Sequence, residues 1–247
     1  MNDLALRALS AASFILLAPI LFVQGRRVRR VTPRLPPADG PRQGIVAGPR
    51  PLRLLIAGES TAVGVGVVTH DEGLAGQTAR ALAAATGRGV SWRVLGRSGA
   101  SARHLVAEFI APAAPIDADV VVIALGVNDT ISVSPVGRWV KALEALFDGV
   151  RGTSSGAVVI VSGVPPLQIF PAFPAPLRHV LGLRARVLDR AAVRWAGRHA
   201  GVTHVPHLTT APADVPAMFC ADRFHPSAAG YARWGAALAA AASDILQ

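Results

Sequence analysis

The sequence has 247 residues, of which 51% are hydrophobic and 16% are charged, and its formal net charge is +10. This composition excludes an intrinsically disordered chain, because such chains lack the apolar residues that form a core. The length predicts one domain, or one domain with an appendage. The single cysteine, Cys220, excludes a disulfide framework, a cysteine-rich zinc site and a c-type haem site.

Most of the excess positive charge lies near the N-terminus. Residues 24–53 contain eight arginines and one acidic residue, whereas residues 54–247 have a net charge of only +3. A nucleic-acid-binding domain would carry its positive charge on the folded domain itself. We therefore expect no nucleic-acid partner.

An apolar segment precedes the basic stretch. Residues 4–23 read LALRALSAASFILLAPILFV, about as long as the ~20 residues needed to cross a bilayer. Three interpretations are open: a transmembrane anchor, a cleaved signal peptide, and an amphipathic or buried helix that does not cross the membrane. Asp3 offsets Arg7 and no A-x-A cleavage site follows, so the pattern argues against a signal peptide. We expect a transmembrane anchor over residues 1–23.

The arginines that follow the apolar segment indicate on which side of a membrane the folded domain would lie. Arg26, Arg27, Arg29 and Arg30 would keep their side of the membrane cytoplasmic, and they would attract anionic lipid. We therefore expect a membrane-anchored chain whose folded part is cytoplasmic. If the segment is instead an export signal, the folded part lies outside the cytoplasmic membrane.

The remaining chain divides into a linker and a folded domain. Residues 24–50 are basic and rich in Pro, Gly and Arg, which is typical of a linker. Residues 51–247 alternate between strand-like and helix-like patterns. Strands are expected at 52–57, 92–95, 120–125, 157–161 and 202–205, and helices at 74–85, 135–150, 183–199 and 227–246. This alternation predicts an α/β fold, a three-layer α/β/α sandwich with a mostly parallel five-stranded sheet.

Polar residues follow the expected strands, at the edge where functional groups of such sheets collect. Ser60 follows the first strand, at an expected strand-to-helix passage where the helix dipole would face an anion. Gly99 lies in a turn after the second strand, and Asn128 follows the third. Asp222 precedes His225 by three residues, so a turn lets the carboxylate orient the imidazole towards a serine. Each pattern alone is also typical of a turn or a helix cap.

In this order and spacing, the four patterns resemble the blocks of the SGNH hydrolases, also called GDSL esterases and lipases, from about residue 54 to residue 231. The resemblance implies an SGNH or flavodoxin-like fold, with Ser60 as nucleophile, His225 as base and Asp222 as the residue that orients the base. It also implies an oxyanion hole formed by the N–H groups of Ser60 and Gly99 and by the side chain of Asn128.

Two carboxylates adjoin these candidate residues. The family motif has aspartate before the serine, whereas this chain has Glu59. Because both residues carry a carboxylate, we expect Glu59 to support the hydrogen bonding of the turn. Asp129 follows Asn128 and is expected to organise its loop.

The resemblance implies hydrolysis of an acyl ester, a thioester or an acetyl group through an acyl-enzyme intermediate, without a metal or an organic cofactor. The expected partner is a small acyl ester or a lipid. Two alternatives stay open, a membrane-tethered acyltransferase and a non-catalytic lipid- or glycan-binding module, because fold does not determine function. Nucleotide binding at Gly64-Val65-Gly66 is excluded, since the rest of a phosphate-binding motif is missing.

A proline-rich segment, residues 164–177, holds five prolines and five large apolar side chains. We expect Leu167, Ile169, Phe170 and Phe173 to line an acyl pocket or to rest against a bilayer. The alternative is a loop folded onto the core of the domain. Six further histidines have no carboxylate at a comparable spacing and are expected on the surface or in packing: His70, His104, His179, His199, His204 and His207.

Overall fold

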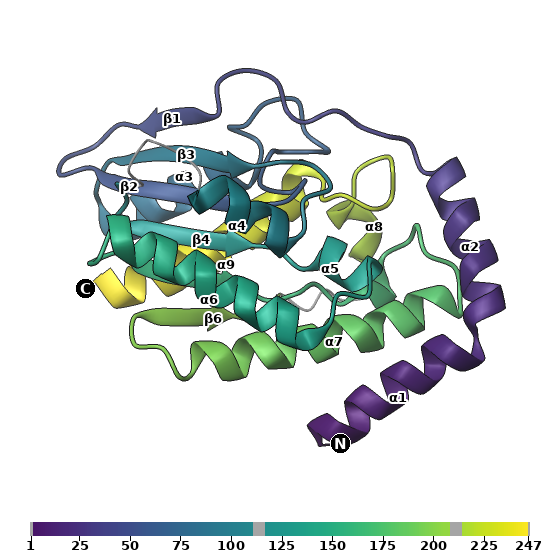
Figure 1. Cartoon of the computed structure of the whole chain (residues 1–247). Coiled ribbons are helices and arrows are strands. Elements are labelled where there is room, and N and C mark those ends of the chain that lie inside the picture. Colours follow the sequence, from purple (N-terminus) through teal and green to yellow (C-terminus); the bar gives the residue numbers. More distant parts are fainter. Residues whose placement is uncertain (1, 111–116, 208–213, 247) are drawn as a thin grey trace.

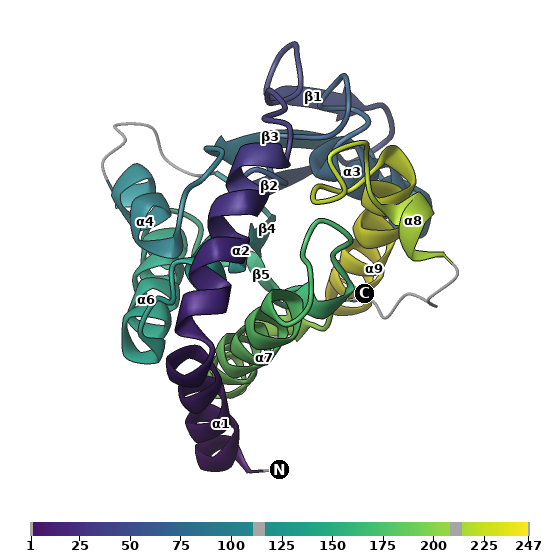
Figure 2. The same cartoon turned by 90° about the vertical axis from the view of Figure 1, so that its right-hand side faces the viewer.

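The computed structural model describes residues 2–110, 117–207 and 214–246, in which helices cover both faces of one sheet (Figures 1 and 2). The sheet is mostly parallel; only the edge strand β1 runs antiparallel to its neighbour β3. The predicted three-layer α/β fold is therefore confirmed. In the spatial order of the sheet, the strands are β1 (Gln43–Val46), β3 (Val90–Gly96), β2 (Leu52–Gly58), β4 (Val120–Ala124), β5 (Val158–Ser162) and β6 (Val202–Val205).

Two groups of helices form the outer layers. Helices α3 and α9 pack together on one face, whereas α4, α6 and α7 cover the other (Figure 2). Three short elements lie in the loops at the site: α5, the 3-10 turn η1 and α8. The bounds are α3 (Leu74–Thr86), α4 (Ala102–Ile110), α5 (Val127–Ile131), α6 (Val136–Thr153), η1 (Leu167–Ile169), α7 (Leu177–Ala196), α8 (Val215–Met218) and α9 (Ala228–Leu246).

The central strands are buried on both faces, which explains their continuous apolar sequences. Because successive strand side chains point to opposite faces, Leu54 and Ile56 of β2 enter the core under α3 and α9. Leu55 and Ala57 enter the core under α4, α6 and α7. Strands that are apolar throughout thus build two cores at once.

The prediction of five strands was wrong by one strand. β1 lies inside residues 24–50, which the sequence predicts to be a linker, and it pairs with β3. Gly44 faces Trp92 across this pair, and a Cβ at Gly44 would overlap the Trp92 ring. A four-residue strand that contains a glycine has no clear alternation, so its pairing with β3 decides its conformation.

The N-terminal segment forms two helices, α1 (Asp3–Leu16) and α2 (Ala18–Val31), which pack near α7 (Figure 1). Among the described residues, no single helix is long and apolar enough to cross a membrane; α1 and α2 pass that test only as a pair, bent by 80°. The predicted single transmembrane helix is therefore not supported. Pro19 lies in the first turn of α2. Proline cannot continue a preceding helix, because it lacks the N–H and its ring clashes with the earlier turn.

Candidate active site

Ser60 follows β2 but does not begin a helix. Residues 60–66 form successive turns, in which the N–H of Val65 donates to the carbonyl of Ser60 at 3.1 Å, and α3 begins only at Leu74. Ser60 therefore lies in these turns and not at the expected helix N-terminus. The serine is buried, with 8% of its surface exposed.

The structure brings Ser60, His225 and Asp222 into one chain of hydrogen bonds. His225 Nε2 lies 3.0 Å from Ser60 Oγ, and His225 Nδ1 lies 2.6 Å from Asp222 Oδ2. The second carboxylate oxygen, Oδ1, accepts from the backbone N–H groups of Phe224 and His225, both at 2.8 Å. The tight turn before α9 thus fixes the carboxylate and, through it, the orientation of the imidazole.

The environment of Asp222 keeps it ionised. Burial is the largest single influence on its pKa and acts to raise it. The hydrogen bonds from His225 and Phe224 together outweigh burial and lower the pKa of Asp222 to about 2. A carboxylate that is charged at neutral pH stabilises a protonated imidazole beside it.

The three expected oxyanion donors differ in their availability. Within the described ranges, the N–H groups of Ser60 and Gly99 have no acceptor, and Gly99 has φ +79°, which favours glycine. Asn128 Nδ2, in contrast, donates to Glu59 Oε2 at 2.5 Å and to the Ala100 carbonyl at 3.1 Å. Both amide hydrogens of Asn128 are therefore engaged, so an oxyanion would have to replace Ala100 as an acceptor.

Glu59 is a buried carboxylate that links Ser60 to the Asn128 loop. Its Oε1 accepts from the N–H of Val127 at 2.9 Å, and its Oε2 accepts from the N–H of Asn128 at 3.0 Å. Burial raises the pKa of Glu59 to about 7, although these hydrogen bonds oppose the rise. The extra methylene of glutamate is thus accommodated, and the carboxylate holds both the backbone and the side chain of Asn128.

Asp129 holds the same loop from its other side. It is 3% exposed, and its Oδ2 accepts from the N–H of Ala102 at 2.8 Å, in the first turn of α4. This bond connects the Asn128 loop to the helix that follows the Gly99 turn. Asp129 therefore positions backbone rather than facing Ser60.

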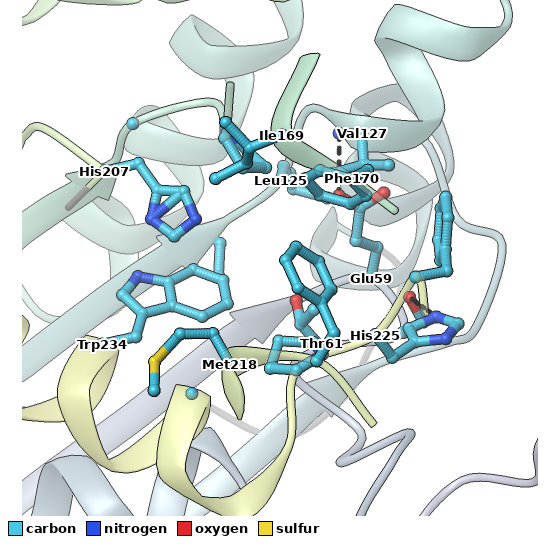
Figure 3. Close-up of a pocket in the computed structure, with 18 residues that line it drawn as sticks. Glu59, Thr61, Leu125, Val127, Ile169, Phe170, His207, Met218, His225 and Trp234 are labelled. Carbon is cyan, nitrogen blue, oxygen red and sulfur yellow. Dashed lines mark hydrogen bonds between the residues drawn. The ribbon is translucent and has the colours of Figure 1, made fainter. Parts of the chain in front are cut away.

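A mainly apolar cavity of about 80 Å³ opens beside Ser60 and His225 (Figure 3). Ile169 and Phe170, from the proline-rich segment, line it. Leu167 and Phe173 do not line it: Leu167 is fully buried in the core, and Phe173 packs behind Phe170 at 6.0 Å between ring centroids. The segment thus both walls the cavity and folds onto the core.

Gly99 and Asn128 line a separate, more open hollow of about 360 Å³. Ser60 and His225 line the first hollow and not the second. Glu59 lines the first hollow and hydrogen-bonds Asn128 in the second. Glu59 therefore connects the two sets of candidates through its hydrogen bonds to Asn128.

The comparison with known proteins decides the family. The chain matches the GDSL-like Lipase/Acylhydrolase family over residues 56–233. It belongs to this family. Over 195 residues it is 33% identical to a "GDSL-like esterase Rv1075c" from Mycobacterium tuberculosis, an alignment that covers 74% of this chain and 59% of that protein.

Solved structures share the GDSL fold at low sequence identity. The lipase Lip_vut3 from a goat rumen metagenome aligns with a TM-score of 0.64 and 18% identity, over 79% of this chain and 100% of that chain. The lipase/acylhydrolase from Enterococcus faecalis aligns with a TM-score of 0.57 and 18% identity, over 78% of this chain and 96% of that chain. These likenesses establish the fold of this GDSL-family chain.

The sequence of this GDSL-family chain did not predict several of the residues that line the cavity. Phe224 lines the cavity and packs on Phe170 at 5.5 Å between ring centroids, and its place beside His225 was the available signal. Met218, Phe219 and Trp234 also line the cavity, and nothing in their sequence spacing indicates it.

The six other histidines have varied surroundings. His199 lies 3.1 Å from Glu144 and His204 lies 2.9 Å from Asp189, through carboxylates that are distant in sequence. These two contacts are consistent with packing roles. His207, which we also expected on the surface or in packing, instead lines the cavity beside Ser60.

Proposed function

We propose that this chain is a serine hydrolase that cleaves short acyl esters through an acyl-enzyme intermediate. The observation that carries the proposal is the hydrogen-bonded chain from Ser60 through His225 to Asp222, which opens into an apolar cavity. A nucleophile, a base and a carboxylate that orients the base are the parts that acyl transfer to serine needs.

The mechanism follows from these contacts. Ser60 Oγ attacks the acyl carbonyl while His225 Nε2 accepts its proton, and Asp222 stabilises the resulting imidazolium. The oxyanion is held by the free N–H groups of Ser60 and Gly99, and Asn128 joins them when its amide exchanges the Ala100 carbonyl for the oxyanion. His225 then protonates the leaving alcohol as the ester C–O bond breaks. Water, deprotonated by His225, attacks the acyl-enzyme and releases the acid and Ser60.

The cavity size supports a short acyl group. A cavity of about 150 Å³ accommodates benzene, which has six heavy atoms. The cavity beside Ser60, at about 80 Å³, would then hold roughly three or four heavy atoms of an acyl chain. Its apolar walls favour hydrocarbon over charged groups.

The first experiment tests the nucleophile. The whole chain is incubated with a fluorophosphonate probe, and hydrolysis of p-nitrophenyl acetate, butyrate and octanoate is measured. We expect Ser60→Ala to abolish both labelling and hydrolysis, whereas Ser155→Ala, a change of an exposed serine, leaves both intact. Labelling that survives in Ser60→Ala would remove Ser60 as the nucleophile, and equal rates for the acetate and the octanoate would remove the short-chain assignment.

The same acyl-enzyme can pass its acyl group to an alcohol instead of water. Partition between acid and transferred product is measured with a glycerol or sugar acceptor. Release of acid even at high acceptor concentration supports the hydrolase. Predominant transfer assigns the chain to the acyltransferases, and binding of acyl esters without turnover assigns it to non-catalytic modules.

We further propose that α1 and α2 bind an anionic membrane surface. Outward side chains of these helices are strongly exposed, among them Ile15 at 75%, Leu16 at 79% and Phe22 at 65%. On the inner side, Leu6 is buried, and Asp3 forms an ion pair with Arg190 at 3.3 Å. An exposed apolar face next to clustered arginines is typical of helices that lie in a lipid interface.

Co-sedimentation with vesicles tests this association. We expect the whole chain to bind vesicles that contain phosphatidylglycerol, to bind phosphatidylcholine vesicles weakly, and to detach at high salt. Combined replacement of Ile15, Leu16 and Phe22 by serine should abolish binding. Equal sedimentation of this variant and the unchanged chain would contradict the proposal. A cytoplasmic location stays a proposal, which protease protection in sealed, oriented membrane vesicles tests.

A further inference from the structure

The cavity beside Ser60 ends at a second imidazole. His207, just after β6, lines the cavity on the side opposite His225 and lies next to Trp234 (Figure 3), with 5.3 Å between their ring centroids. Its Nδ1 is buried and has no hydrogen-bond partner in the part of the chain that the structure describes. Buried polar atoms are nearly always hydrogen-bonded, so this atom is a place where a ligand is expected.

Two polar groups near His207, the indole N–H of Trp234 and Asp189 Oδ1, already have hydrogen-bond partners. The indole N–H of Trp234 donates to Ser162 Oγ at 3.0 Å. Asp189 Oδ1 lies 2.9 Å from His204 Nε2 and accepts from the N–H of Val164 at 2.9 Å. The side chains that complete this end of the cavity include Met218 and Ile169, which are apolar. A trapped water would therefore find few partners besides the imidazole.

The imidazole is neutral at physiological pH. Burial lowers the pKa of His207 to about 4, and the charge of Asp189 opposes this only in part. A neutral imidazole has one donor and one acceptor nitrogen, and which nitrogen is protonated depends on the partner. His207 can therefore donate to a keto oxygen or accept from a hydroxyl.

We propose that His207 is a specificity residue that binds a polar oxygen on the acyl chain, so that the enzyme prefers short hydroxyacyl or oxoacyl esters. This inference rests on the proposed ester hydrolysis at Ser60. The reacting carbonyl lies at Ser60, and the acyl chain extends through the apolar cavity to His207. An acyl chain without a polar oxygen leaves Nδ1 of His207 unpaired. Leaving a buried polar group unpaired costs free energy, so the site discriminates against esters that lack this oxygen.

The test compares matched esters of equal chain length on the full chain. The pairs are the p-nitrophenyl esters of butyrate and 3-hydroxybutyrate, and of pentanoate and 4-oxopentanoate. We expect kcat/KM of the unchanged protein to favour at least one polar ester over its plain partner by about 10- to 100-fold. His207→Leu should reduce this ratio to near one, because the rate on the polar ester falls more than the rate on its plain partner. His207→Gln, which keeps a donor and an acceptor, should retain part of the preference.

The control variant changes a histidine that does not line the cavity. His179→Leu changes an exposed histidine on α7 and should leave every ratio unchanged. The inference is overturned if the unchanged protein shows no preference, as expected for a site that holds only water, or if His207→Leu keeps the preference. It is also overturned if His207→Leu slows all esters equally, because that result indicates a structural role. If His207→Leu does not fold, the ratio in the unchanged protein and in His207→Gln decides.

Failure of the inference differs from failure of the proposed function. If Ser60 is labelled by the fluorophosphonate and plain esters are hydrolysed without preference, only the role of His207 is wrong. If no ester is hydrolysed and Ser60 is not labelled, the esterase function itself is wrong.

Discussion

Glu59 Oε2 accepts hydrogen bonds from both nitrogens of Asn128, from the backbone at 3.0 Å and from the side chain at 2.5 Å. The residue before Ser60 therefore holds a candidate oxyanion donor that follows a different strand, β4. Glu59 is 2% exposed, so its charged form depends on these donors and on the N–H of Val127, which donates to Oε1. A change in the protonation of Glu59 therefore alters the hydrogen bonds that position Asn128.

The pKa of Glu59 predicts how stability changes with pH. Burial raises this pKa from 4.5 to about 7, so folding favours the protonated acid. The protonated carboxyl of Glu59 therefore stabilises the fold below pH 4.5. This contribution to the free energy of unfolding, roughly 3 kcal/mol at most, is lost as the pH rises to about 7. We expect the free energy of unfolding, measured in urea, to fall less between pH 4.5 and pH 7.5 in Glu59→Gln than in the unchanged protein. Asp148→Asn, at an exposed position on α6, serves as the control, and an unchanged slope in Glu59→Gln would contradict the assignment.

Asn128→Ala should lower kcat about 10²- to 10³-fold, a loss of about 3 kcal/mol of transition-state stabilisation, with little change in KM. The physical reason is that the amide contributes only once the oxyanion forms and displaces the Ala100 carbonyl as acceptor. Steady-state kinetics with p-nitrophenyl butyrate measure the change, and urea unfolding checks that the fold is kept. A rise in KM at constant kcat would instead assign Asn128 to substrate binding.

Phe170 and Phe173 form a matched pair for testing the acyl cavity. They are buried to a similar degree, 6% and 5% exposed, and they stack on one another, but only Phe170 lines the cavity. Phe170→Leu should therefore shift the preference towards longer p-nitrophenyl esters, because it enlarges the cavity. Phe173→Leu should destabilise the fold by a similar amount without shifting this preference. The same shift in both variants would mean that loosening of the loop, not cavity size, is responsible.

Cys220 should resist alkylation despite lying two residues before Asp222. Burial is the main cause that raises the pKa of its thiol to about 11, and the thiol also donates to Asp222 Oδ1 at 3.1 Å. At pH 8 about one thiol in a thousand is then ionised, and the thiolate is the reactive form. Mass spectrometry should find iodoacetamide labelling at least ~100-fold slower in the native protein than in urea. Equal rates would show that the thiol is not held in this environment.

The α/β fold and the candidate residues Ser60, Asn128, Asp222 and His225 were predictable because their signals are local. Each residue lies in a short pattern after an apolar strand or before the last helix, and parallel strands bring their carboxyl ends to one edge of the sheet. The two-helix arrangement of the N-terminus had a local signal as well, Pro19, which the prediction of one continuous apolar helix did not weigh.

Other features depend on contacts between distant residues. β1 is a strand because it pairs with β3 and because Gly44 lets it pass Trp92, and neither condition is visible in four residues. Ser60 lies in turns rather than at a helix start, whereas the helix expected at 74–85 does begin at Leu74, because its apolar periodicity is local.

The sequence by itself determined the alternation of strands and helices from residue 52 onward, the charge distribution and the chemical groups available for catalysis, because these follow from side-chain type and near-neighbour spacing. Only the tertiary structure decided that Glu59 engages Asn128, that Phe170 rather than Phe173 faces the cavity, and that His207 closes it. Packing brings residues from separate elements together, and their burial then sets which polar atoms are paired and which are left for a substrate.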